Sequence, residues 1–402
     1  PISVIDEFGN VHAHTAKMEV LERTQTDDKL DFDWDEARIY FLLTDRFNDG
    51  DPANNDPNGE NYGEWDPGEY FGGDFQGIIE KLDYLKELGI NTIWISPIVD
   101  NINHGVDTND PNVNYYGYHG YWAKNFEAIE EHFGDIDTFK KLIEEAHDRG
   151  IKIMVDVVLN HAGYGLKESD ADKGTGISNY PTDEDRARFA GMFRTVNESG
   201  DVRSELSGLP DFMTEDEAIR NMIIEWQTQW LDKVRTDRGD TIDYFRVDTV
   251  KHVDDTTWKA FKNRLTEIEP EFKLIGEYYG GGPSNTGGQL QSGQMDSLLD
   301  FEFKNRVKDF LDGNIDEAFN YFRNRERLMN NTATFGQFLS SHDEDGFLKQ
   351  YLNGDTGKMK VAAALQITSK GQPVIYYGEE LGLSGLSNYP YYENRYIMPW
   401  DE

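Results

Sequence analysis

The sequence contains no cysteine. Disulfide bonds, thiol catalysis and zinc sites built on cysteine are therefore excluded, and the redox compartment is left open. No run of 18 apolar residues occurs, and the N-terminal residues Pro1-Ile2-Ser3 are not a basic region followed by an apolar stretch. The sequence thus predicts neither a membrane span nor a retained signal peptide.

Basic residues are scarce, since 39 lysines and arginines stand against 76 aspartates and glutamates, giving a formal net charge of -37. No basic patch with interleaved aromatic residues offsets this charge. Nucleic acid and anionic lipid would be repelled, so a polyanionic partner is not expected. The acidic residues are spread along the whole chain, which favours a neutral or cationic ligand and a saline or alkaline exterior that screens their repulsion.

The chain is long and apolar enough for a large core. Its 402 residues are 37% hydrophobic and 13% aromatic, which suits two average domains or one large α/β barrel. Short apolar runs alternate with amphipathic helical patterns, as is typical of parallel β/α units. Strands are predicted at residues 37–45, 90–98, 151–161, 243–250, 273–279, 295–303, 334–343 and 372–380, with helices between them, for example at 74–89, 135–150, 221–234 and 256–269. Eight such units predict a TIM (β/α)8 barrel, whose active site lies at the C-terminal ends of the strands.

The predicted barrel is interrupted once. Residues 162–212 are polar, glycine-rich and weakly periodic, so they predict a small inserted domain after the third strand, with the barrel formed by residues 36–161 and 213–402. Residues 1–35 alternate like strands and are interpreted as an N-terminal extension or the end of a preceding β domain. The closing helix after the eighth strand is absent from this sequence. We therefore expect further polypeptide after Glu402 to cover the apolar outer face of that strand.

Three predicted strands end at or near an acidic residue, namely Asp248, Glu277 and Asp343. Arg246 lies two positions before Asp248 on the same face of its strand, where its charge would keep that carboxylate ionised. Glu277 follows apolar residues, which favours a desolvated, protonated carboxyl group. One charged and one neutral carboxyl group are what glycoside hydrolysis requires. The alternative for any one of these acids alone is a loop cap or an ordinary ion pair.

One loop is rich in oxygen ligands. The stretch DRFNDGDPANND, residues 45–56, holds four aspartates and three asparagines, and GGD follows at 72–74. Aspartate, asparagine, glycine and proline are ordinary turn formers. Taken alone, the stretch is therefore consistent with either a solvated turn or a calcium-binding loop.

Six motifs identify a family resemblance and occur in that family's order from about residue 37 onward. DVVLNH (156–161), FRVDTVKH (245–252), GEYY (276–279) and SSHD (340–343) resemble the four main conserved regions of the α-amylase family of glycoside hydrolases, with GINTIWISP (89–97) and LPDF (209–212) as two auxiliary regions. The resemblance implies Asp248 as nucleophile, Glu277 as general acid and then base, and Asp343 as the carboxylate that grips the sugar and stabilises the transition state. In a retaining enzyme the first two carboxyl groups lie about 5 to 5.5 Å apart.

The same resemblance implies six further residues that orient the nucleophile or contact the substrate. Arg246 is expected to orient Asp248, and Tyr121 to stack on the sugar at the cleavage site. His161 and His342 are expected to hydrogen-bond that sugar, and Lys251 and His252 to line the side that receives the leaving chain. For His161 and His342 singly, a structural histidine is the ordinary alternative, and no cysteine-and-histidine spacing suggests zinc.

The resemblance also implies one or two structural calcium ions. A loop of this kind in cyclodextrin-forming and maltogenic relatives holds calcium, and the matching ligands are Asp49, Asp51, Asn54, Asn55, the Gly72 carbonyl and Asp74. A second ion between barrel and inserted domain would use Asn160, Asp211 and the backbone carbonyl of His252, with at least one further ligand that the sequence does not place. Six oxygen ligands suit this hard cation.

The predicted activity is retaining endo-hydrolysis of α-1,4-glucosidic bonds in starch and related maltooligosaccharides outside the cell. Alternatives within the family are a transglycosylase, a maltogenic exo-amylase or the amylase part of an amylopullulanase. The SSHDED stretch lacks the usual asparagine before its His-Asp pair, and residues 162–212 lack the aromatic-centred stretch of cyclodextrin-forming enzymes. No YNWGY-type segment, a mark of pullulanases, is present. The alternative from a different functional class is a non-catalytic glucan-binding relative. Such relatives usually lose at least one of the acids that correspond to Asp248, Glu277 and Asp343. The C-terminal β-sandwich usual in the family is also absent.

Overall fold

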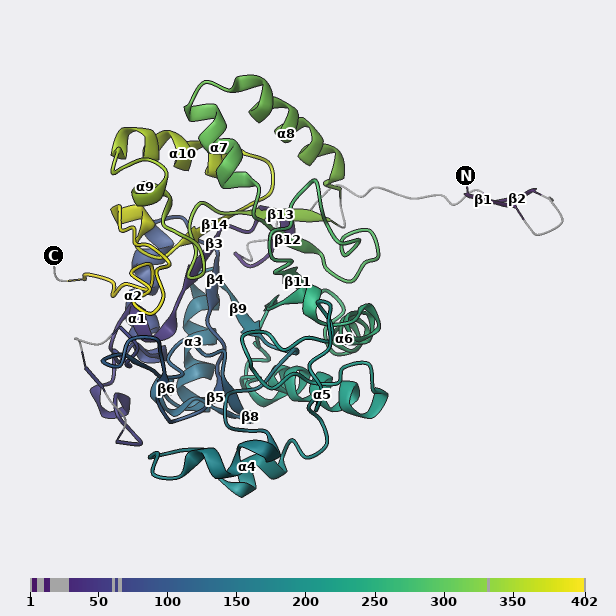
Figure 1. The fold of residues 1–402 in the computed structure, drawn as a ribbon. Helices are drawn as coiled ribbons and strands as arrows, with labels where there is room; N and C mark the ends of the chain where they lie inside the picture. Colours follow the sequence, from purple (N-terminus) through teal and green to yellow (C-terminus); the bar gives the residue numbers. More distant parts are fainter. Residues whose placement is uncertain are drawn as a thin grey trace.

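The computed structural model describes residues 2–5, 11–14, 29–59, 62–63, 67–330 and 333–400. Its central feature is a closed barrel of eight parallel strands (Figure 1). In their order of pairing these are β10 (Tyr244–Val247), β11 (Lys273–Gly276), β12 (Ser297–Asp300), β13 (Thr334–Gln337), β14 (Gln372–Tyr376), β3 (Ile39–Leu42), β4 (Thr92–Ile95) and β9 (Lys152–Val157). β9 pairs with β10 and closes the barrel, so the predicted TIM barrel is confirmed.

Each barrel strand coincides with one of the predicted apolar runs. β3, with the sequence IYFL, and β4, with TIWI, are buried at every position. Strands covered on both faces need buried side chains at successive positions, which is why these runs do not alternate with polar residues. The observed strands are shorter than predicted because the residues after them, such as Asp248 after β10, leave the ladder and form loops at the barrel mouth.

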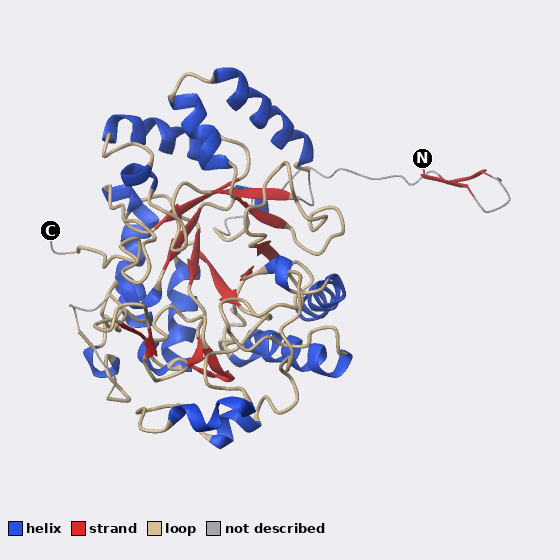
Figure 2. Cartoon of the chain, viewed as in Figure 1, coloured by secondary structure: helices blue, strands red, loops and turns tan. Residues whose placement is uncertain are grey.

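Helices surround the barrel (Figure 2). The four helices predicted above are α2 (Phe75–Glu87), α3 (Ile136–Asp148), α5 (Glu217–Lys233) and α6 (Asp255–Ile268). The other helices of the barrel units are α1 (Thr44–Phe47), α7 (Phe303–Leu311), α8 (Ile315–Leu328), α9 (Phe347–Gln350) and α10 (Thr356–Thr368). Asp74 begins α2 by accepting a hydrogen bond from the backbone N–H of Gly77, as an N-cap residue does.

Two of the eight strands lack a following α-helix. Residues 277–296, between β11 and β12, form turns, bends and one isolated bridge between Gly282 and Asn285, although a helix is the rule at this place in the fold. After β14 only the 3-10 helix η6 (Glu379–Leu381) occurs within the described residues, as the sequence predicts. Pro373 and Tyr377 are buried and Ile375 is partly buried, so the outer face of β14 exposes less apolar surface than expected.

Two segments at the barrel mouth form irregular structure. Between β4 and α3, β5 (Val99–Asn101) pairs with β8 (Ala123–Ile129), and β6 (Val106–Asp107) pairs with β7 (Asn114–Tyr115). Neither strand pair is predicted from the sequence. Between β9 and α5, the predicted inserted segment contains the 3-10 helix η4 (Glu168–Gly174) and α4 (Asp183–Ala187). A bridge between His161 and Asp211 joins the two ends of this segment.

At the N-terminus, β1 (Ile2–Ile5) and β2 (Val11–His14) form an antiparallel pair. The rest of residues 1–28 lies outside the described residues, so most of the predicted N-terminal extension is not covered by the structure. Nowhere in the described part of the chain does a helix have the length and apolarity needed to cross a membrane.

Candidate active site

The C-terminal ends of the barrel strands open into a cleft of about 940 Å³. The structure brings together all three predicted catalytic acids, Asp248, Glu277 and Asp343, in its walls. Five of the six other predicted residues also line it, namely Tyr121, His161, Lys251, His252 and His342. The sixth, Arg246, lies beneath the cleft floor, with a side chain only 1% exposed.

Arg246 connects acids from three adjacent strands. It lies in β10 opposite Asp156 of β9, and Glu277 directly follows β11. Arg246 Nη1 is 2.7 Å from Asp248 Oδ1 and 2.9 Å from Asp156 Oδ2. Its Nη2 is 3.1 Å from Glu277 Oε2. A single buried guanidinium therefore holds two predicted catalytic carboxyl groups in a fixed relation, with a third acid behind them.

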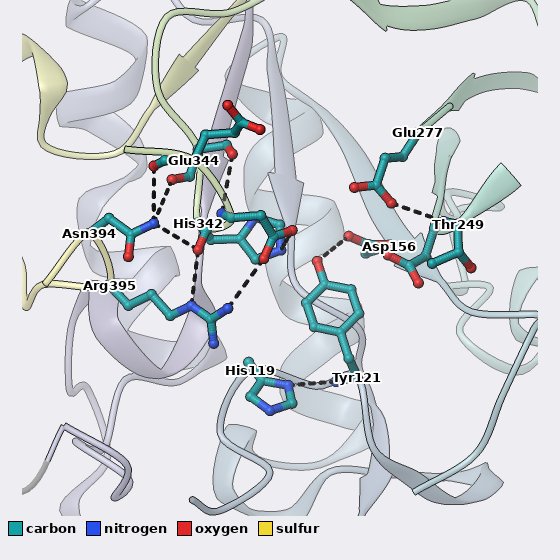
Figure 3. Close-up of polar contacts among 12 residues, drawn as sticks. His119, Tyr121, Asp156, Thr249, Glu277, His342, Glu344, Asn394 and Arg395 are labelled. Atoms are coloured by element: carbon teal, nitrogen blue, oxygen red, sulfur yellow. Dashed lines mark hydrogen bonds and ion pairs between the residues drawn. The ribbon is translucent and has the colours of Figure 1, made fainter. Parts of the chain in front are cut away.

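Glu277 is buried, and the backbone N–H of Thr249 donates to its Oε2 at 3.0 Å (Figure 3). Burial raises the pKa of Glu277 to about 8, with Arg246 opposing the rise and the charges of Asp248 and Asp343 adding to it. The group is therefore protonated at neutral pH, in agreement with the desolvation expected after an apolar strand. A carboxyl group in this state can give its proton to a leaving oxygen.

Asp343 is the most exposed of the three acids, with a side chain 37% accessible. His342 Nε2 lies 3.1 Å from its Oδ2, and Arg395 Nη2 lies 3.2 Å from its Oδ1. Burial by itself would raise the pKa of Asp343, but His342, Arg395 and Arg246 outweigh it and lower the pKa. The carboxylate is consequently held charged at the cleft surface, where it can accept hydrogen bonds from a ligand.

The imidazoles of His161 and His342, together with Tyr121, form the wall beside the acids. Tyr121 OH donates to Asp156 Oδ2 at 2.7 Å, and its ring stacks on that of His342 with centroids 5.3 Å apart. His161 Nε2 lies 3.2 Å from the Tyr121 carbonyl oxygen. Burial lowers the pKa of His342 to about 4, so this imidazole is neutral at neutral pH. Its Nδ1 is buried without a hydrogen-bond partner.

Lys251 and His252 lie in the short 3-10 helix η5 (Val250–His252) at the other side of the cleft. Lys251 Nζ donates to the Tyr279 carbonyl at 3.3 Å. His252 Nδ1 lies 2.8 Å from the carbonyl oxygen of Asp201, in the segment after β9. Tyr279 also lines the cleft, and 48% of the residue is exposed. This side thus offers a cation and an exposed aromatic ring, which suit the hydroxyl groups and apolar faces of a sugar.

The predicted calcium loop fits a cation in part. The amide oxygens of Asn54 and Asn55 are buried without any hydrogen-bond donor, which is an arrangement that a cation would satisfy. Gly72 has φ +87 and lies against the Asn55 side chain, where a Cβ atom would come within 2.7 Å of Oδ1. Asp74, in contrast, accepts four hydrogen bonds, from Gly50 N, Asp51 N, Gly77 N and Asn54 Nδ2. The bond from Gly77 caps α2 and the other three hold the loop, so both carboxylate oxygens of Asp74 already have donors.

The second predicted calcium site brings three oxygen atoms together. Asn160 Oδ1 faces Asp211 Oδ1 at 3.2 Å and the His252 carbonyl oxygen at 3.0 Å, with no donor between them. Either a cation lies among them, or the Asn160 amide is rotated so that its NH₂ group donates to both. The donor set therefore fits calcium. Arg194 Nε binds the other carboxylate oxygen of Asp211 at 2.5 Å.

One acidic group not predicted as a metal site also occurs. Asp100, Glu130 and Glu131 place their oxygens within 4.8 Å of one another. Lys124 Nζ lies 3.1 Å from Asp100 Oδ1, so a positive charge is already supplied by the chain. These acids are consistent with a structural cluster of ion pairs.

Asp156, which lies beneath the cleft, and several residues that line the cleft are not identified from the sequence. Asp156 lies within the quoted DVVLNH motif, and only its contacts with Arg246 and Tyr121 show that it supports both. Tyr164, Tyr389, Tyr392 and Arg395 also line the cleft. The last three lie in the segment after β14, which the sequence predicts to be a polar, tyrosine-rich loop. No short-range pattern places such a loop over the strand ends of a barrel.

Comparison with known proteins gives one consistent result. The family model described as "Alpha amylase, catalytic domain" matches residues 41–398. The chain is 33% identical over 375 residues to the "Beta/alpha-amylase" of Paenibacillus polymyxa, covering 89% of this chain and 28% of that protein. It is 30% identical over 369 residues to the "Cyclomaltodextrinase" of Thermoanaerobacter pseudethanolicus, covering 87% of this chain and 58% of that protein. The chain thus spans only part of these relatives.

Solved structures agree with these sequence matches. An α-amylase structure from Anoxybacillus is similar with a TM-score of 0.75 at 30% identity, covering 92% of this chain and 76% of that chain. The α-amylase of Geobacillus thermoleovorans, in complex with acarbose, is similar with a TM-score of 0.73 at 27% identity, also covering 92% and 76%.

Proposed function

Because the chain belongs to the α-amylase family of glycoside hydrolases, we propose that it performs retaining endo-hydrolysis of α-1,4-glucosidic bonds in starch and related maltooligosaccharides. The observation that carries the proposal is the arrangement around Arg246. One guanidinium binds both Asp248 and Glu277, while burial raises the pKa of Glu277 to about 8. The site therefore presents a carboxylate next to a guanidinium together with a protonated carboxyl group, as a retaining mechanism requires.

In the first step, an oxygen of Asp248 attacks the anomeric carbon as the bond to the leaving oxygen breaks. Glu277 gives its proton to that oxygen, so the shortened chain departs as a neutral alcohol. In the second step, Glu277 takes a proton from water, whose oxygen attacks the anomeric carbon and releases Asp248. Two inversions at this carbon retain the α configuration, and Glu277 is protonated again for the next cycle.

Asp343, His342 and Tyr121 hold the sugar at the reacting centre in this proposal. Asp343, kept charged by Arg395, accepts hydrogen bonds from sugar hydroxyl groups and stabilises positive charge that develops at the ring. His342 is neutral and can donate one hydrogen bond. Tyr121 is fixed by its bond to Asp156, so its ring offers a rigid face for stacking.

Calcium is proposed as a structural ion. One site would use Asp49, Asp51, Asn54, Asn55 and the Gly72 carbonyl, and the other Asn160, Asp211 and the His252 carbonyl. When bound, it would neutralise converging oxygens and fix loops of the cleft wall. The second site would link β9, the segment after it and the loop after β10. No step of the chemistry passes through it.

The cleft is large and open, and residues that line it lie on both sides of the acids. A chain could therefore extend past the acids in both directions, which favours endo action on a polymer. A substrate of this size would be met outside the cell, which is the proposed location. Relatives include a cyclomaltodextrinase and proteins described as "Neopullulanase 2" and "Cyclomaltodextrin glucanotransferase". The alternatives to the proposed endo-hydrolysis of starch are accordingly hydrolysis of cyclic or branched glucans and glycosyl transfer.

Time-resolved product analysis on soluble starch, maltoheptaose, a cyclodextrin and pullulan tests the proposal. We expect a rapid fall in starch chain length, a mixture of maltooligosaccharides and initial products with the α configuration by NMR. Release of one short product from chain ends would instead indicate exo action, and early products longer than the maltoheptaose supplied would indicate transfer. A folded protein that binds starch without cleaving any substrate would support the non-catalytic alternative.

A further inference from the structure

The loop that carries Asp343 is enclosed by a segment distant in sequence. Asn394, which is 1% exposed, directs its Nδ2 at three backbone carbonyl oxygens of this loop. The distances are 3.1 Å to Ser341, 2.8 Å to His342 and 3.1 Å to Glu344 (Figure 3). These carbonyls lie on both sides of Asp343 in the chain. One buried amide thus determines where the backbone of Asp343 lies.

The neighbouring Arg395 acts on the same loop through its side chain. Its Nε donates to the His342 carbonyl at 3.1 Å and its Nη2 lies 3.2 Å from Asp343 Oδ1 (Figure 3). Its Nη1 is 3.4 Å from Tyr118 OH, and its guanidinium carbon lies 4.1 Å from the ring centre of Tyr392. These contacts fix the guanidinium itself, so it can define one orientation of the Asp343 carboxylate.

Two additional contacts tie the same segments together. Ser387 donates to Asp345 Oδ1 from its backbone N–H at 2.8 Å and from its hydroxyl at 3.0 Å. Gly346 N donates to the Gly385 carbonyl at 2.7 Å. Asp343 would otherwise be free to move, because its side chain is over a third exposed and belongs to a loop of bends.

We infer that Asn394 and Arg395 are positioning residues for Asp343, Asn394 through the backbone of residues 341–344 and Arg395 through the carboxylate. This inference rests on the proposed function, in which Asp343 stabilises the transition state. A small displacement of such a group lowers turnover strongly, by up to about 100-fold for 1 Å. Loss of these residues should therefore lower kcat, whereas loss of a substrate contact alone would raise KM.

Asn394→Ala and Arg395→Gln, with Arg395→Lys as the conservative variant, test the inference on maltoheptaose. We expect kcat to fall about 10- to 100-fold with KM changed less than about threefold, and Arg395→Lys to recover part of the loss. Exposed residues of α8 provide the matched controls Asn324→Ala and Arg327→Gln, which should leave both constants unchanged. A normal kcat in Asn394→Ala and Arg395→Gln, or a change confined to KM, would overturn the inference.

The pH profile gives a readout that a purely structural role would not move. The charged and titratable groups facing Asp343 are His342, Arg395, Arg246, Asp248, Glu277, Tyr121, Tyr279 and Tyr392. Arg395→Gln removes one positive charge from this set, so the acidic limb of kcat/KM should move to higher pH. An unmoved limb contradicts the proposed role of Arg395.

A double-mutant cycle and a crystal structure separate this inference from the proposed function. If Arg395 acts through Asp343, Arg395→Gln should add little to the loss caused by Asp343→Asn. If the wild type cleaves no glucan, the proposed function fails, and the position of the Asp343 carboxylate in crystals of Arg395→Gln still tests the inference. A carboxylate unmoved from its wild-type position would overturn it. Should Asn394→Ala fail to fold, the Arg395 variants provide the same tests.

Discussion

In the proposed mechanism, Arg246 determines how the acids of the cleft lie relative to one another. Its side chain is almost fully buried, yet it contacts Asp156, Asp248 and Glu277, which come from the ends of three neighbouring strands. A guanidinium cannot lose its proton, so it keeps one positive charge among acids whose own protonation varies. Burial and acidic neighbours nevertheless keep the pKa of Glu277 high. The two carboxyl groups can therefore take different roles at a short separation.

The proposed catalytic pair is tested directly by isosteric substitution. Asp248→Asn and Glu277→Gln should each lower kcat by at least about 10³-fold while starch binding is largely retained, because neither change alters shape. The exposed α8 residues Asp316 and Glu326 allow the matched controls Asp316→Asn and Glu326→Gln, which should be neutral. Near-normal turnover of either purified cleft variant would refute the assignment.

The pH dependence of activity should follow the protonation of Glu277. Its proton is present below a pKa of about 8 and is lost above it, so kcat/KM should fall as the pH rises through about 8. The charge of Asp343 raises this pKa, so Asp343→Asn should move the basic limb to lower pH. Residual activity of this variant measured from pH 6 to 10 is sufficient for the test. A limb that moves to higher pH, or one that lies below pH 6 in the wild type, would contradict the assignment of Glu277 as the acid.

At the scale of elements, loops at the strand ends determine the site, and two of them place oxygens without donors. In the loop before α2, the amide oxygens of Asn54 and Asn55 are buried without donors. Between β9 and the loop after β10, oxygens of Asn160, Asp211 and His252 meet. Unsatisfied buried acceptors are destabilising by about 1–3 kcal/mol each unless a cation or a rotated amide relieves them. Calcium binding would therefore stabilise the cleft wall.

Chelation should consequently lower the melting temperature. Calcium at 100 times its dissociation constant stabilises the folded state by about 2.7 kcal/mol per site if it binds only there. Asn55→Ala and Asn160→Ala should each reduce the calcium-dependent rise in melting temperature, measured by calorimetry with and without chelator. Asn324→Ala on α8 is the matched control. If the wild-type melting temperature does not respond to calcium after complete removal of metal, residues 45–56 form an ordinary solvated turn. The Asn160 amide is then rotated so that its NH₂ group donates.

At the scale of the whole molecule, charge is the outstanding property. The formal net charge of -37 is spread over a barrel whose core is apolar. Ion pairs such as Arg149–Glu145 and Arg238–Asp148 use part of the basic residues, but acids outnumber bases by 76 to 39. The excess negative charge therefore repels itself, and the folded state is destabilised by repulsion that salt can screen.

Stability should accordingly rise with sodium chloride. The screening length falls from about 30 Å at 0.01 M to about 3 Å at 1 M salt, which suppresses long-range repulsion more than it weakens short ion pairs. Melting temperatures measured across this range, with calcium held saturating, provide the test. Potassium chloride should give the same rise, whereas sodium sulfate is unsuitable because it also strengthens apolar burial. A melting temperature that stays constant or falls as sodium chloride increases would contradict the expected saline exterior.

The sequence by itself determines the barrel, because its signal is local. Every barrel strand is a short apolar run buried on both faces, and each acid at the barrel mouth follows such a run within a few residues. The positions of Asp248 after β10 and Glu277 after β11 could thus be predicted from alternation and motif alone. The β5–β8 and β6–β7 pairs could not, because β5, β6 and β7 have only two or three residues each and the register of the β5–β8 pair shifts twice.

Only the tertiary structure decides how distant segments complete the site. Asn394 and Arg395 lie about fifty residues after Asp343 in the chain, and closure of the barrel brings them against its loop. The apolar run before Glu277 already indicates its burial, but its pKa also depends on the charges of Arg246, Asp248 and Asp343, which no local pattern contains. Sequence patterns describe neighbours along the chain, whereas desolvation and hydrogen bonding depend on neighbours in space. For this reason the predicted catalytic acids and Arg246 could be named from the sequence, whereas Asn394 and Arg395 could not.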